Sequence, residues 1–100
     1  MKLVFVSGPY RGDVESNIAK AKQAAIELWQ QGYAVICPHL NTANFDGLCP
    51  DETWLKGDLE ILKRCDTVYF LKDWKQSQGA LKEHELAKSL GLEMLWEGTK

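Results

Sequence analysis

The chain has 100 residues, a length that predicts one domain spanning residues 1–100. Its 14 acidic and 12 basic residues give a formal net charge of −2, and no basic stripe stands out, which argues against a nucleic acid polymer as a partner. No run approaches the ~20 apolar residues of a membrane helix, no segment resembles a signal peptide, and the three cysteines are odd in number, so we expect a cytoplasmic protein without a membrane partner.

Strand and helix patterns alternate along the chain. Short apolar or β-branched runs predict four strands, at residues 2–6, 33–37, 67–71 and 92–96. Apolar residues at helical spacing predict three helices between them, at about residues 13–31, 51–64 and 79–90. Alternating strands and helices imply a parallel sheet with right-handed crossovers. The sequence therefore predicts an α/β fold, a small Rossmann-like or flavodoxin-like three-layer sandwich with four to five parallel strands.

The longest irregular stretch predicted is residues 39–50, which is rich in Asn, Asp, Gly and Pro and has the length of a lid or binding loop. In parallel sheets, ligands bind beyond the carboxyl ends of the strands, where the strand order reverses. We therefore expect the chemistry in the segments that follow the first three strands: residues 7–12, 39–50 and 72–83.

The segment at residues 7–12 reads SGPYRG and predicts a tight turn between strand and helix. Its backbone N–H groups and the positive end of the helix dipole can hold an anion. Arg11 adds a planar fork of donors that suits phosphate. An ordinary turn with an exposed arginine fits the same letters, and the spacing alone favours neither interpretation.

The segment SQGALKE predicts the start of the last helix, with Ser77 or Gln78 as its N-cap. Gly79 and Ala80 allow a ligand to approach the backbone closely. Glu83 follows about one turn into the helix, where the dipole favours the carboxylate anion and hence a nucleophile. The alternative is that Glu83 only favours the helix start.

Three further residues are weaker candidates. Asp58 is predicted at the edge of the core, because its neighbour Leu59 belongs to a predicted apolar stripe of Leu55, Leu59, Leu62 and Cys65. His39 follows a strand and could contact a ligand. Trp74 could stack on a base or cover the core. His39, Cys37 and Cys49 match no zinc spacing, so no metal site is predicted.

The whole chain resembles the nucleoside 2-deoxyribosyltransferase-like superfamily, and within it a small branch similar to 2′-deoxynucleoside 5′-phosphate N-hydrolases. The resemblance lies in VFVSGPYRG, GDLEILKRCDTVYFL and DWKQSQGALKEHELAKSLG. It implies cleavage of the N-glycosidic bond of a 2′-deoxynucleoside or its 5′-monophosphate, with transfer of the sugar to water or to another base. It implies a small-molecule substrate, no cofactor and a homo-oligomer, with Trp96 and the loop around Phe45 as interface candidates.

The resemblance also implies roles for single residues. Glu83 corresponds to the nucleophile, Asp58 to the aspartate that contacts the sugar and supports leaving-group protonation, and Arg11 and Ser77 to phosphate-binding residues. The residues predicted to bind substrate or phosphate are Ser7, Gly8, Tyr10, Arg11, Ser77, Gly79 and Ala80. The possible base contacts are His39 and Trp74.

One position departs from the family pattern. Phe5 stands where the family has a tyrosine whose hydroxyl contacts the nucleophile. Three consequences are open: Tyr10 takes over this contact, Glu83 is less well oriented, or turnover is lost. The last of these would make the protein a catalytically silent nucleotide-binding module of the same fold.

Overall fold

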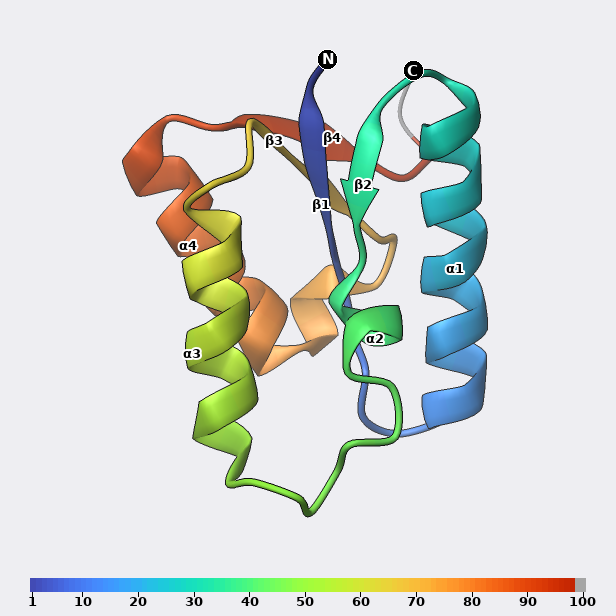
Figure 1. Ribbon diagram of the computed structural model, residues 1–100, viewed down its shortest axis with the longest axis vertical. Helices are drawn as coiled ribbons and strands as arrows, with labels where there is room; N and C mark the ends of the chain where they lie inside the picture. The colour runs from blue at the N-terminus through green and yellow to red at the C-terminus, as the bar shows by residue number, and fades with distance from the viewer. Residues whose placement is uncertain (99–100) are drawn as a thin grey trace.

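The computed structural model of the protein describes residues 1–98, which form a parallel sheet between two layers of helices (Figure 1). The elements in chain order are β1 Leu3–Ser7, α1 Val14–Gln30, β2 Ala34–Ile36, α2 Pro38–Asn41, α3 Asp51–Leu62, β3 Thr67–Phe70, the 3₁₀ helix η1 Trp74–Gln76, α4 Gln78–Leu90 and β4 Glu93–Trp96. The four strands lie in the order β2-β1-β3-β4, and every pair is parallel. The predicted fold class is confirmed.

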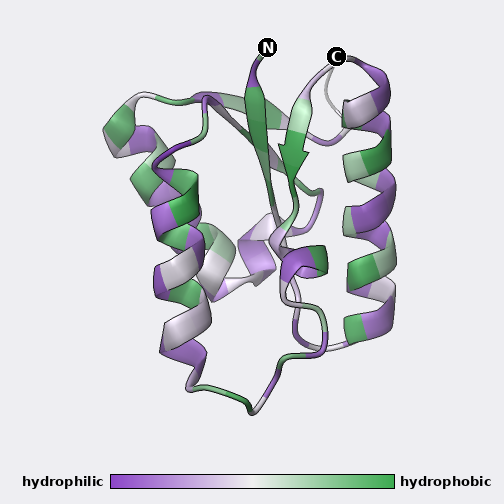
Figure 2. Ribbon diagram, viewed as in Figure 1, coloured by the Kyte–Doolittle hydropathy of each residue, from purple (hydrophilic) through white to green (hydrophobic). Residues whose placement is uncertain are grey.

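The side chains of β1 alternate between the two faces of the sheet, as the pleat of a strand requires. Val4 and Val6 pack with α1, whereas Phe5 packs with residues of α3, β3 and α4. In Figure 1, α1 lies on one side of the sheet and α3 and α4 on the other. Figure 2 shows β1 and β2 as largely hydrophobic and the helices as two-sided. The central strand therefore joins both halves of the core.

The helix ends follow the sequence signals closely. The Asp13 side chain accepts a hydrogen bond from the backbone N–H of Ser16 and caps α1, as predicted. Gly91 ends α4 with φ 70°, in the left-handed region that favours glycine. Each signal here is local, because the cap and the groups it satisfies lie within one helical turn.

Two local predictions need correction. The stretch 39–50 is not irregular throughout, because Pro38 starts the short helix α2, where the fixed φ of proline suits the first helical position. The apolar stripe of α3 is only partly in the core. Leu62 and Cys65 are buried, whereas Leu55 and Leu59 are half-buried, and Leu55 lines a cavity.

Gly8, directly after β1, is required by a close approach of the end of β3. The backbone N–H of Leu71 donates to the carbonyl oxygen of Ser7 at 2.8 Å. A Cβ atom on Gly8 would lie 2.5 Å from Cδ1 and 2.8 Å from Cβ of Leu71, closer than real Cβ contacts allow. The glycine thus seats the turn after β1 against the end of β3.

Replacement of Gly8 by alanine should destabilise the fold by about 1–3 kcal/mol, because Leu71 or the turn has to shift. Gly57→Ala is the matched control, since a Cβ there has no atom within 4 Å and alanine favours the helix interior by roughly 0.5–1 kcal/mol. Urea unfolding of both variants measures the difference. Equal stability of the two variants would contradict the packing role of Gly8.

Candidate active site

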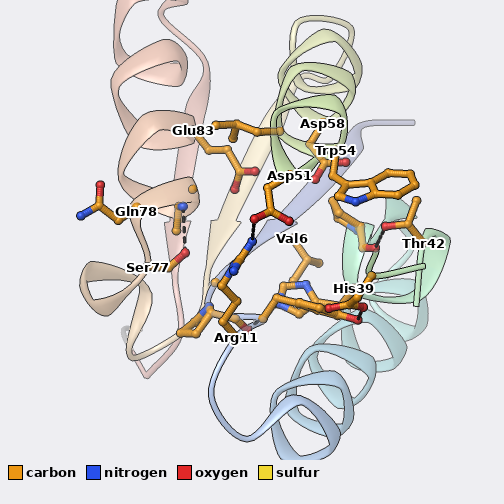
Figure 3. Close-up of a pocket in the computed structure, with 18 of the residues that line it drawn as sticks. Val6, Arg11, His39, Thr42, Asp51, Trp54, Asp58, Ser77, Gln78 and Glu83 are labelled. Atoms are coloured by element: carbon orange, nitrogen blue, oxygen red, sulfur yellow. Dashed lines mark hydrogen bonds and ion pairs between the residues drawn. The ribbon is translucent and has the colours of Figure 1, made fainter. Parts of the chain in front are cut away.

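A cavity of about 480 Å³ opens at the carboxyl ends of the strands. Its lining comes from the segments after β1, β2 and β3, joined by α3 (Figure 3). The strand order reverses between β1 and β3, so the cavity occupies the switch point at which such sheets bind ligands. Its size falls within the range of small-molecule sites. The three segments singled out by the sequence are brought together here.

Glu83 of α4 forms part of the cavity wall and is 7% exposed. Burial raises the pKa of its carboxyl to about 8, and the nearby charge of Asp58 raises it as well, while a hydrogen bond from Ser7 lowers it. The dipole argument from the sequence predicted a stabilised anion. That prediction is wrong for the free protein, because loss of water outweighs the helix start at this depth.

Asp58 of α3 faces the same cavity as Glu83 (Figure 3). It is half-buried, and burial raises its pKa to about 6. Two interacting carboxyls with pKa values near 8 and 6 hold about one proton between them at neutral pH. The pair can therefore supply one acid and one base.

The hydroxyl contact to Glu83 comes from an unexpected residue. Ser7 Oγ donates to Glu83 Oε1 at 2.6 Å, and Ser7 is 1% exposed. Ser7 is not among the residues that line the cavity, so its predicted contact with substrate or phosphate gains no support from the structure. Tyr10 donates instead to Asp46 Oδ1 at 2.6 Å and accepts from the N–H of Asn44. Tyr10 thus does not replace the missing tyrosine hydroxyl, although it lines the cavity.

Arg11 and Ser77 both line the cavity, from the segments that follow β1 and β3. The Arg11 guanidinium is paired with the carboxylate of Asp51, the first residue of α3. Both side chains are at least 70% exposed, and an exposed ion pair contributes only about 0–1 kcal/mol. A bound anion can therefore compete for Arg11.

Ser77 is the N-cap of α4, and its Oγ accepts from the N–H of Ala80 at 3.1 Å. Its O–H remains a donor, because a hydroxyl has one donor and two acceptor sites. The backbone at Gly79 is open, since a Cβ atom at this position would have its nearest neighbours 3.8 Å away. Gly8, Gly79 and Ala80 all line the cavity. This wall offers donors and close access to the backbone.

The end of the cavity between α2 and α3 is aromatic. His39 is buried, and its Nε2 bonds the carbonyl oxygen of Pro9 at 2.8 Å, so in the neutral ring Nδ1 carries the lone pair. Burial lowers the pKa of His39, which favours this neutral form. Phe45 and Trp54 lie with ring centroids 5.9 Å apart. Within residues 1–98, His39 Nδ1 and Trp54 Nε1 are buried without a hydrogen-bond partner.

Trp54 was missed by the sequence reasoning. It lies four residues before Asp58, which places the two side chains on one face of α3. That spacing is the signal that could have found it.

Trp74 does not line the cavity. It packs in an aromatic cluster with Phe70, His84 and Trp96, at centroid distances of 5.0, 4.7 and 5.4 Å. Of the two roles left open by the sequence, covering the core is the one that the structure supports, while the base contact stays an untested prediction. Trp96 also stacks on Phe70 at 4.6 Å. Its role in an interface stays a prediction.

In residues 1–98, no group of three or more His, Cys, Asp or Glu side chains is arranged to hold a metal ion. Over the same residues, no helix has the length and apolar character needed to cross a membrane. Cys37 and Cys65 are buried as free thiols, and Cys49 is exposed.

Comparison with known proteins identifies the fold. A family model described as a domain of unknown function (DUF4406) matches residues 2–96. No curated protein matches the chain. A 2-desoxiribosyltransferase from Leishmania mexicana superposes with a TM-score of 0.72 at 16% identity, over 96% of this chain and 63% of the other. A 2-deoxyribosyltransferase from the psychrotolerant bacterium Bacillus psychrosaccharolyticus gives 0.67 at 21% identity, over 94% and 70%.

The chain therefore spans less than two thirds of the length of the Leishmania protein. The resemblance of the fold to that of the 2-deoxyribosyltransferases is confirmed. The DUF4406 match fits a small branch with this fold.

The burial of Glu83 predicts a pH-dependent stability. Its folded-state pKa of about 8 exceeds its ordinary value of 4.5, so the folded protein keeps a proton that the unfolded chain releases. Stability should therefore fall as pH rises from about 4.5 to 8, by a few kcal/mol at about 1.4 kcal/mol per pKa unit.

Glu83→Gln removes this titration, so the stability of the variant should fall less as pH rises. Its free energy of unfolding should therefore increase relative to that of wild type as pH increases. Denaturant unfolding at pH 5 and pH 8.5 measures it, with the exposed Glu85→Gln on the same helix as control. A constant difference between Glu83→Gln and wild type over this range would contradict the prediction.

Proposed function

The chain belongs to the DUF4406 family, and on that premise we propose that it is an enzyme that cleaves the N-glycosidic bond of a 2′-deoxynucleoside or its 5′-monophosphate. The observation that carries the proposal is the pair of buried or half-buried carboxyls, Glu83 and Asp58, in one cavity at the switch point of a deoxyribosyltransferase fold. Retaining glycosidases use two carboxyls in this way. The further support comes from the two ends of the cavity, one suited to an anion and one to a flat ring.

In the first step, a Glu83 carboxylate oxygen attacks C1′ of the sugar and the bond from C1′ to the base nitrogen breaks. The base leaves with the electron pair of that bond and takes a proton from Asp58. The shared proton must therefore lie on the Asp58 side when attack occurs. Positive charge that develops at C1′ stabilises the Glu83 anion and favours this distribution.

In the second step, water or a second base attacks C1′ and releases Glu83 from the sugar. Asp58, now ionised, takes the proton of the attacking group. The pair returns to its starting state with one proton, so the cycle balances without an added acid, base or cofactor. Hydrolysis and base transfer differ only in which group enters at this step.

Phosphate recognition is assigned to the mouth of the cavity. The Ser77 hydroxyl and the first turn of α4 offer donors, and the positive helix end adds attraction. Arg11 can exchange its exposed Asp51 partner for a phosphate. This layout favours the 5′-monophosphate over the free nucleoside as substrate. The opposite, aromatic end, with His39, Phe45 and Trp54, is then the place for the base.

A second candidate is a nucleotide-binding module without turnover. The observation that favours it is the pKa of about 8 for Glu83, which leaves the nucleophile mostly protonated at neutral pH in the free protein. In this case Glu83→Gln should bind nucleotides as well as wild type does. Calorimetric binding together with assays for free base separates the two functions.

We predict that wild type releases free base from at least one member of a panel of 2′-deoxynucleosides and their 5′-monophosphates. Glu83→Gln should reduce this release by at least about 1000-fold, because the replacement cannot form the glycosyl intermediate. Chromatography of the free base measures it, with Glu85→Gln as the control that keeps activity. Equal activity of Glu83→Gln and wild type, or no release by wild type from any substrate, would overturn the proposal.

The phosphate site has its own test. Arg11→Ala should raise KM for the monophosphate by roughly 10–100-fold, since a hydrogen bond to a charged group contributes about 1.5–3 kcal/mol. The KM for the corresponding nucleoside should change little. Asp51→Asn should lower KM for the monophosphate, because it frees Arg11 from its partner. Arg64→Ala removes a similarly exposed, paired arginine and serves as control. Equal effects of Arg11→Ala on both substrates would contradict a phosphate role.

A further inference from the structure

Ser7 has no part in the proposed reaction as described so far, yet its hydroxyl donates a hydrogen bond to the Glu83 carboxyl. We infer that Ser7 is a positioning residue whose hydroxyl fixes Oε1 of Glu83 and so leaves Oε2 as the oxygen that carries the mobile proton and attacks the sugar. The attack on the sugar depends on the proposed function, whereas the hydrogen bond between Ser7 and Glu83 is a feature of the structure itself.

The geometry of the bond is that of a strong hydrogen bond. The distance of 2.6 Å between Ser7 Oγ and Glu83 Oε1 lies in the range of a hydroxyl that donates to a carboxylate. Both residues are more than 90% buried, so water does not compete for either group. Ser7 Oγ is the donor of this bond and Glu83 Oε1 is the acceptor. When Glu83 is neutral, its own proton is therefore on Oε2.

The backbone around Ser7 leaves the hydroxyl little freedom. Ser7 is the last residue of β1, is paired with Phe70 of β3, and accepts the N–H of Leu71 at its carbonyl oxygen. Two residues earlier, Phe5 faces the same side of the sheet and packs in the core under α4. The hydroxyl that the family pattern has at position 5 is thus supplied two residues later, from the same face.

Several other charged or titratable groups face the cavity. Asp58 of α3 is the one whose charge raises the pKa of Glu83, and Arg11 and Asp51 form their own pair at the mouth. The remaining such groups of the lining are Tyr10, His39, Asp46 and Glu52. None of these is a cause of the pKa shift of Glu83, whereas the Ser7 bond is the one contact that lowers it. Removal of the Ser7 hydroxyl should therefore raise the pKa of Glu83 and not lower it.

The experiment compares four variants of the full chain. Ser7→Ala and Ser7→Cys remove the strong donor, the second with nearly conserved volume, whereas Ser7→Thr keeps a hydroxyl. Thr67→Val is the matched control, because Thr67 is a fully buried hydroxyl of the neighbouring strand that bonds Glu93 and does not contact Glu83. Two quantities are measured: the dependence of kcat on pH, and the titration of the Glu83 carboxyl by ¹³C NMR, with the Glu83→Gln spectrum for assignment.

We expect Ser7→Ala and Ser7→Cys to shift the carboxyl titration and the ascending limb of kcat to higher pH in parallel. At neutral pH, kcat should fall by roughly 10–100-fold while KM changes less than about twofold, because the lost contact acts on the nucleophile and not on binding. Ser7→Thr should restore the wild-type profile, and Thr67→Val should match wild type throughout.

An unchanged carboxyl titration in both Ser7→Ala and Ser7→Cys would overturn the inference. So would a loss of kcat without a shift of its pH profile, which is the pattern of a purely structural defect. If wild type releases no base, the proposed function fails, and the NMR titration alone then decides whether Ser7 controls the protonation of Glu83. An upward shift in the two donor-less variants would support that control independently of turnover.

Discussion

A carboxyl group withdrawn from water stands at the centre of this structure. Glu83 is buried between α4 and the end of β1, and its ionisation there is opposed by desolvation and by the neighbouring charge of Asp58. One short hydrogen bond from Ser7 acts in the other direction. The pKa of Glu83 is therefore sensitive to small changes around it, because it is set by contributions of opposite sign. The geometry of β1, the turn at Gly8 and the placement of α4 all bear on that balance.

Helix α4 is held on two faces. Glu83 and His84 are adjacent in sequence and thus about 100° apart around the helix. Glu83 faces the cavity and bonds Ser7, while His84 stacks on Trp74 and lies against Phe70. A rotation of α4 that moved the carboxyl would have to break the aromatic contacts as well. The aromatic cluster around Trp74, for which the sequence left a base contact and core packing both open, fixes the helix that carries the carboxyl.

The fold was predictable because its signals are local. Four strands, the cap at Asp13, the cap at Ser77 and the end at Gly91 each depend on a few neighbouring residues. The location of the cavity followed from a general rule about parallel sheets and not from any one residue. The contacts within the site were harder. Ser7 meets Glu83 across 76 positions of sequence, and the choice of Asp51 as partner for Arg11 depends on where α3 starts. The periodic patterns of a sequence do not indicate which distant side chains pair in this way.

The resemblance to a family pointed to Glu83 and Asp58, which share the cavity, but not to the Ser7 hydroxyl that bonds Glu83, because Ser7 lies two positions further along the strand than the family's tyrosine. The burial of Glu83 was likewise missed, since the dipole argument considered the helix alone and not the sheet beneath it. Predictions from one element fail where two elements share a buried polar group.

The sheet has a consequence for how copies of this chain can meet. Its outer strands are short: β2 has three residues and β4 has four. Short edges offer few free backbone groups, which is a common protection against pairing with a strand of another molecule. The homo-oligomer expected from the sequence would thus have to be built from side-chain surfaces, on helices or loops, and not by a sheet that continues from one copy to the next.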